Sequence, residues 1–158
     1  MKQYFPKTGI ECQMRDSILH AGKKPAAMDE SAVQAMVVAL YDTGGLKKTD
    51  LDTCIFNLIL PRGSTLSLDG ASSLEGLGGF HGSTHIVRGG KAITLYYSAN
   101  VYSMELDAFR QNGIVAFPRP WQNVVATLYH ELNEFRTDPD VSDAIANASS
   151  FEPILIPR

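Results

Sequence analysis

The residues best suited to chemistry lie in one short run, positions 129–140, which reads YHELNEFRTDPD. Within it, Glu134 follows His130 by four positions. On a helix this spacing places both side chains on one face, where they can bind a single metal ion. Glu131 lies about 100° further round the helix, at the edge of the same surface. The spacing therefore predicts His130 and Glu134 as two ligands of a metal ion.

The order H-E-x-x-E has the layout of the zinc-peptidase motif H-E-x-x-H, with glutamate in place of the second histidine. A catalytic zinc takes three protein ligands and keeps one position for water, whose pKa it lowers to about 7. Glu131 would accept the proton of that water as the catalytic base. Zinc is therefore the expected cofactor. One histidine and two carboxylates also suit manganese, calcium or magnesium, so another divalent metal stays open.

Three residues are candidates for the third ligand. Asp138 lies about 12 Å beyond His130 along a regular helix, but Pro139 ends the helix there and lets the chain turn back. Asp140 has the same separation from His130 as the third ligand of the extended metzincin motif has from the first. Both aspartates also have an ordinary interpretation as turn or cap residues around the proline. His81 stands between glycines, which allow close backbone approach and suit a residue that lines a cleft.

Local patterns predict the elements that position these residues. Apolar residues at helical spacing indicate helices, and runs of apolar and β-branched residues indicate strands. Eight glycines between positions 63 and 90 predict a loop-rich region there, with short strands at most. The expected helices cover 29–43, 121–136 and 141–148, the expected strands 53–60, 91–102 and 113–117, and an extended tail 151–158.

Bulk composition favours one globular domain over residues 1–158. Hydrophobic residues make up 44% of the chain and charged residues 20%, as is usual for folded proteins. The net charge is −3 and no basic cluster exceeds two residues, which argues against nucleic-acid binding. No apolar run approaches the roughly 20 residues that cross a bilayer, so we expect no membrane span.

Localisation and oligomeric state stay open. The first residues, MKQYFP, lack the apolar stretch of a secretory signal, so we expect a cytoplasmic protein or one exported in a processed form. Cys12 and Cys54 could be two buried thiols or one disulfide, and the latter would imply an oxidising compartment.

Several segments resemble a group of zincin-like bacterial and fungal proteins. Residues 130–139, HELNEFRTDP, are similar to that group's H-E-[LI]-x-E-x-x-T-D-P segment. Residues 53–63, TCIFNLILPRG, are similar to its T-x-Y-x-V-x-L-P-x-G strand. Residues 79–83, GFHGS, match its G-[YF]-H-x-S element, which plant Exordium-like proteins also carry. The resemblance covers residues 29–140.

This resemblance implies an α+β fold of the zincin-like type: a single domain with a small mixed sheet, a backing helix and an active-site helix below the edge strand. It assigns His130, Glu131 and Glu134 to the site, together with His81 and Asp138. The chain differs from metzincins in that it has neither the second histidine nor a methionine after the motif.

Two functions follow as expectations. The first is a metal-dependent hydrolase of the metallopeptidase type, acting on a peptide or protein. The second is a catalytically inactive zincin-like module with a binding or structural role. In the second case the polar side of the helix, opposite its apolar side, would be a solvated face or would bond to neighbours.

Overall fold

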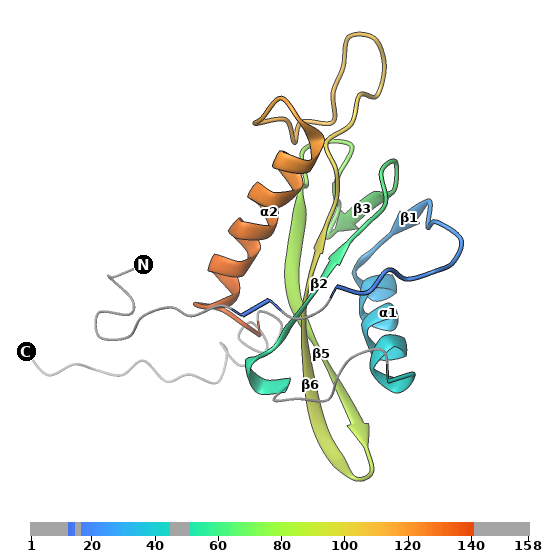
Figure 1. Cartoon of the computed structure of the whole chain (residues 1–158), viewed down its shortest axis with the longest axis vertical. Helices are drawn as coiled ribbons and strands as arrows, with labels where there is room; N and C mark the ends of the chain where they lie inside the picture. The colour runs from blue at the N-terminus through green and yellow to red at the C-terminus, as the bar shows by residue number, and fades with distance from the viewer. Residues whose placement is uncertain (1–12, 15–16, 45–50, 141–158) are drawn as a thin grey trace, which may run out of the picture.

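The computed structural model describes residues 13–14, 17–44 and 51–140 (Figure 1). In this part of the chain two helices and two three-stranded sheets form an α+β fold, as expected. The elements, in chain order, are β1 (Ala27–Met28), α1 (Glu30–Asp42), the short 3-10 helix η1 (Leu51–Thr53), β2 (Ile55–Ile59), β3 (Thr65–Leu68), β4 (Ala71–Ser72), β5 (Gly79–Arg88), β6 (Lys91–Asn100) and α2 (Pro120–Phe135).

The larger sheet has the strand order β2-β6-β5. β5 and β6 form an antiparallel hairpin, and β2 runs parallel to β6. Gly89 and Gly90 make the two-residue turn with φ values of 58° and 75°, a conformation that favours glycine and suits tight hairpins. The hairpin leaves β5 as an edge strand among the described residues. The smaller sheet, β1-β3-β4, is also mixed.

The two helices cover opposite faces of the β5–β6 hairpin (Figure 1). Successive side chains of a strand point to opposite faces, and two neighbouring tyrosines of β6 show this directly. The Tyr97 hydroxyl accepts a hydrogen bond from Gln34 of α1. The Tyr96 ring instead packs edge-on against the Phe135 ring of α2, with the ring centroids 5.3 Å apart. Most of the apolar core lies on the α1 side, where Val33, Val37, Leu95, Tyr97 and Ala99 are buried.

The start of α2 is fixed by polar contacts. Pro120 occupies the first turn, where its missing N–H costs nothing, and the Gln122 side chain accepts a hydrogen bond from the Arg119 N–H. Buried Asn123 accepts hydrogen bonds from the backbone N–H groups of Ala116 and Phe117. These contacts set the position at which the helix leaves the preceding loop.

Two glycines let α2 approach β5 closely. A Cβ on Gly79 would lie 2.6 Å from the Ala99 carbonyl oxygen and 2.9 Å from Thr127 Cγ2. A Cβ on Gly78 would lie 2.6 Å from Thr127 Oγ1. Gly78 and Gly79 therefore serve helix–sheet packing rather than a turn. The prediction of loops with short strands at most over 63–90 was wrong for Gly79–Arg88, where β5 spans ten residues.

The remaining expectations have mixed outcomes. The helices expected over 29–43 and 121–136 and the strands expected over 53–60 and 91–102 correspond to α1, α2, β2 and β6. The strand expected over 113–117 is wrong, because Asn123 rather than a neighbouring strand bonds the backbone there. The helix expected over 141–148, the tail over 151–158 and Cys12 lie outside the described residues. No helix in the described ranges has the length and apolarity to cross a bilayer.

Candidate metal centre

The three polar residues of the H-E-x-x-E run face different surroundings on α2. The Glu131 side chain is turned toward the sheet and is only 6% exposed. The side chains of His130 and Glu134 are 66% and 50% exposed. Glu131 lies seven positions, about two helical turns, after buried Val124, so the face of α2 that packs inward also carries this carboxylate. A buried carboxylate requires a partner.

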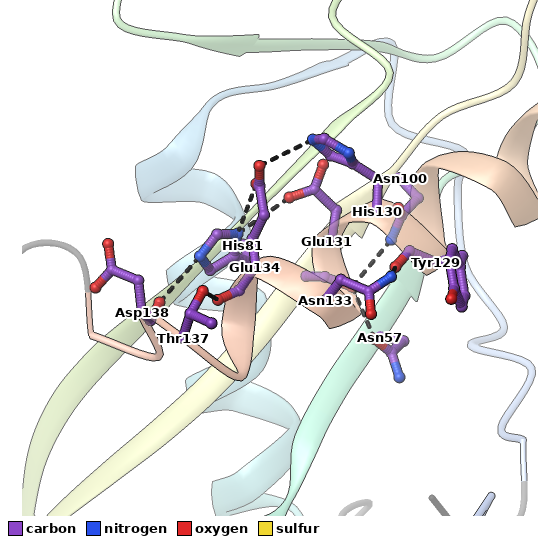
Figure 2. Close-up of polar contacts among 11 residues, drawn as sticks. Asn57, His81, Asn100, Tyr129, His130, Glu131, Asn133, Glu134, Thr137 and Asp138 are labelled. Carbon is purple, nitrogen blue, oxygen red and sulfur yellow. Dashed lines mark hydrogen bonds and ion pairs between the residues drawn. The ribbon is translucent and has the colours of Figure 1, made fainter. Parts of the chain in front are cut away.

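His81 of β5 supplies that partner (Figure 2). Its Nδ1 lies 3.1 Å from Glu131 Oε2 and 3.8 Å from Glu134 Oε2. Its other ring nitrogen, Nε2, lies 3.1 Å from the backbone carbonyl oxygen of Asp138. Edge strand and helix are thus joined by a histidine whose two nitrogens both have oxygen partners.

The surroundings favour a charged His81 when no metal is bound. The hydrogen bond to Glu131 raises the pKa of His81 above its ordinary value, and burial opposes this rise. The Asp138 carbonyl oxygen and the negative charges of Glu131 and Glu134 raise this pKa further. Both carboxylates lie at Nδ1, so in the metal-free protein they favour the protonated form of His81.

The same three side chains are grouped closely enough to hold a metal ion. One nitrogen of His81 and one oxygen each of Glu131 and Glu134 lie within 4.8 Å of one another. One imidazole and two carboxylates suit zinc or manganese. A divalent ion would replace the proton on His81 and offset the negative charge of the glutamates. The donor set therefore fits a divalent metal.

The structure places the sequence candidates as follows. His130 and Glu134 are adjacent, with Nε2 3.0 Å from Oε1 (Figure 2), but His130 is outside the cluster formed with His81. Glu131, expected as the base, faces His81 instead. Asp138 reaches His81 through its backbone oxygen. The Asp140 carboxylate bonds to Ser83 and His85 of β5, away from His130.

A groove lies beside this cluster. Its volume is about 430 Å³, and both Glu131 and His130 contribute to its wall. The rest of the lining comes from the two loops that precede β5 and α2, from the first residue of β5 and from α2: Gly76, Leu77, Gly78, Gly79, Gly113, Ile114, Val115, Ala116, Asn123, Ala126 and Thr127. A ligand in the groove would therefore reach the cluster through Glu131.

A chain of polar side chains underlies α2, and the sequence did not reveal it. Asn100 donates a hydrogen bond to Ser98 Oγ, which donates to Asn57 Oδ1 (Figure 2). Within the described residues the buried Asn100 Oδ1 has no hydrogen-bond partner. The strand periodicity of β6, which places Ser98 and Asn100 on the α2 side, could have indicated this polar face once the sheet order was known.

Comparison with known proteins adds no family to this geometry. No family model, curated protein or solved structure matches this chain. The assignment of a function therefore depends on the side-chain arrangement alone.

Proposed function

We propose that this chain is a metal-dependent hydrolase whose metal is held by His81, Glu131 and Glu134. The observation that carries the proposal is the convergence of three ligand atoms from β5 and α2 within 4.8 Å. One of the three residues, Glu131, also lines a groove. Glu131 is buried at this point, and burying a carboxylate is costly unless a cation compensates it. Buried ionisable side chains of this kind are common at the active sites of enzymes.

A divalent metal in this site supplies a polarised, readily deprotonated water and a Lewis acid for a carbonyl group. Among the chain's own residues, His81, Glu131 and Glu134 would each bind the metal through one nitrogen or oxygen atom. His130 lines the groove, and its Nε2 lies 3.0 Å from Glu134 Oε1. We assign His130 as the group that takes or gives a proton in the groove, the commonest role of histidine in enzymes.

The proposed substrate is a peptide or protein. The groove is open, and glycines at both of its loop walls allow an extended backbone to approach closely. A zincin-like fold is part of the same proposal. It is supported by the position of α2 against the antiparallel edge strand β5, with α1 on the opposite face of the sheet.

One observation favours a second function, a non-catalytic zincin-like module. His81 and Glu131 satisfy each other without a metal, and His130 pairs with Glu134. Such a cluster could join α2 to β5 as a structural ion pair, although buried pairs add little net stability over apolar packing.

Peptide hydrolysis tests the first function against the second. The purified chain would be incubated with a mixture of fluorogenic peptides and with Zn²⁺ or Mn²⁺. Hydrolysis that stops on chelation and in Glu134→Gln, but continues in the exposed control Glu105→Gln, supports the hydrolase. Metal binding without hydrolysis of any peptide would favour the module.

A further inference from the structure

Three alternate residues of β5 contact the segment that follows α2. His81 bonds the Asp138 carbonyl oxygen at 3.1 Å. The Ser83 hydroxyl donates to Asp140 Oδ1 at 2.6 Å, and His85 Nε2 lies 3.3 Å from Asp140 Oδ2. These three β5 side chains share one face because the strand period is two. The segment therefore lies along β5, on the strand face that also carries His81 of the side-chain cluster.

The other end of the segment is fixed by the helix. The backbone N–H groups of Thr137 and Asp138 both donate to the Glu134 carbonyl oxygen, each at 2.9 Å. The Thr137 hydroxyl donates to the same oxygen at 2.9 Å. Pro139 cannot continue these bonds, because it has no N–H. The Asp138 carbonyl is thus held between α2 on one side and Asp140 on the other.

The contact at Nε2 determines which nitrogen of His81 can bind a cation. A histidine that ligates a metal through one nitrogen commonly donates the N–H of the other to a carbonyl or carboxylate, which fixes its tautomer and ring orientation. In the neutral ring that binds a cation, Nε2–H is donated to the Asp138 carbonyl oxygen, and the Nδ1 lone pair is then directed toward Glu131 and Glu134.

We propose that Asp140 is a positioning residue of the metal centre. Its bonds to Ser83 and His85 hold the Asp138 carbonyl against His81 Nε2, which presents Nδ1 to the metal. This inference rests on the proposed metal site. It assigns Asp140 a different role from that of the third ligand, which the sequence spacing suggested, since its carboxylate oxygens are engaged by β5 side chains.

Metal titration of the full chain tests this role. Asp140→Ala should weaken the affinity for Zn²⁺ or Mn²⁺ by about tenfold, the lower end of what second-layer partners contribute. Asp140→Asn keeps an oxygen that accepts from Ser83 and should bind within about threefold of wild type, since hydrogen-bond partners but not charge are needed. A direct ligand would lose far more in the Asn variant, and that result would overturn the proposal. Asp138→Ala keeps its carbonyl and should bind as wild type does.

A second measurement tests the contact between Asp138 and His81 without any metal. In metal-free protein, NMR would follow exchange of the His81 Nε2 proton with solvent, which should be faster in Asp140→Ala than in wild type. Equal exchange and equal metal affinity in the two proteins would overturn the positioning role. If wild type binds no metal, the proposed function fails and with it the role at a metal centre, and the exchange rates then decide only whether Asp140 orients the His81 ring. Ser83→Ala removes only one of the two bonds and replaces Asp140→Ala in both measurements if that variant does not fold.

Discussion

Glu131 Oε2 of α2 lies 3.1 Å from His81 Nδ1 of β5, and both side chains are almost completely buried. Fifty positions separate the two residues in the chain. Their contact joins the C-terminal half of α2 to the edge strand, and Glu131 of this pair also lines the groove. The stability of the fold and the chemistry of the site therefore depend on the same contact.

Removal of His81 should destabilise the metal-free protein. His81→Ala leaves the Glu131 carboxylate buried without its partner, which should lower the free energy of unfolding by roughly 3 kcal/mol. The exposed pair of His130 and Glu134 contributes less than about 1 kcal/mol, so His130→Ala is the matched control. Urea denaturation in the presence of a chelator measures both. Equal stability of His81→Ala and wild type would contradict the buried ion pair.

The close approach of α2 to β5 predicts a distinction between two neighbouring glycines. Gly79→Ala should cost about 1–3 kcal/mol of stability, because its Cβ would meet the Ala99 backbone oxygen. Gly78→Ala should also destabilise, but its closest contact is the Thr127 side chain. Thr127→Ala should therefore relieve Gly78→Ala and only partly relieve Gly79→Ala.

Thermal denaturation of the single and double variants measures this difference, since contacting residues are not additive. Gly22→Ala, whose Cβ would meet nothing closer than 3.9 Å, is the control. Equal rescue of both glycine variants by Thr127→Ala would show that the backbone contact at Ala99 is not limiting.

The cap of α1 predicts an acid-dependent loss of stability. The Ala32 N–H and the Ser31 hydroxyl donate to Asp29, which lowers the pKa of this carboxyl below its ordinary value of 3.8. The unfolded chain then binds the proton more readily, so the contribution is complete above the ordinary pKa and is lost as pH falls through the lowered one. Asp29→Ser keeps a capping oxygen without a charge that titrates.

Denaturation between about pH 2 and 6, in steps of about half a unit, should show a steeper loss of stability with falling pH in wild type than in Asp29→Ser. Parallel curves over this range would mean that Asp29 does not titrate with folding.

Metal addition should stabilise the protein. An ion that binds only the folded state adds about 2.7 kcal/mol at a concentration one hundred times its Kd, and a chelator should reverse the effect. Differential scanning calorimetry with and without Zn²⁺ or Mn²⁺ provides the comparison. A melting temperature that does not respond to either metal would count against the site.

The sequence predicted the helices well, because each has a clear apolar period and a clear boundary. α1 begins after the Asp29 cap, and α2 begins at Pro120 and ends before Pro139. The prediction from sequence failed for β5, because its glycines were interpreted as turn residues. Gly79 and Gly82 are needed instead because Thr127 and Tyr97 pack against the places where side chains would stand. That need exists only in the folded structure.

The site was predicted in part. Spacing on the helix indicated that Glu131 and Glu134 belong to a polar face, and the glycines beside His81 indicated a residue near a cleft. Spacing alone could not show how far the helix is rotated about its axis. That rotation, set by packing against β5 and β6, buries Glu131 and exposes His130. The contacts of Asp140 depend on sheet register, which no local pattern encodes.

The most direct test of the metal site is metal content, measured by mass spectrometry on protein purified without chelator or nickel and then incubated with zinc or manganese. Wild type and His130→Ala should each retain about one ion per chain, as a single three-ligand site requires, and His81→Ala should retain none. No metal in wild type would contradict the account. Loss of metal in His130→Ala with retention in His81→Ala would also contradict it, and would return the ligand role to His130.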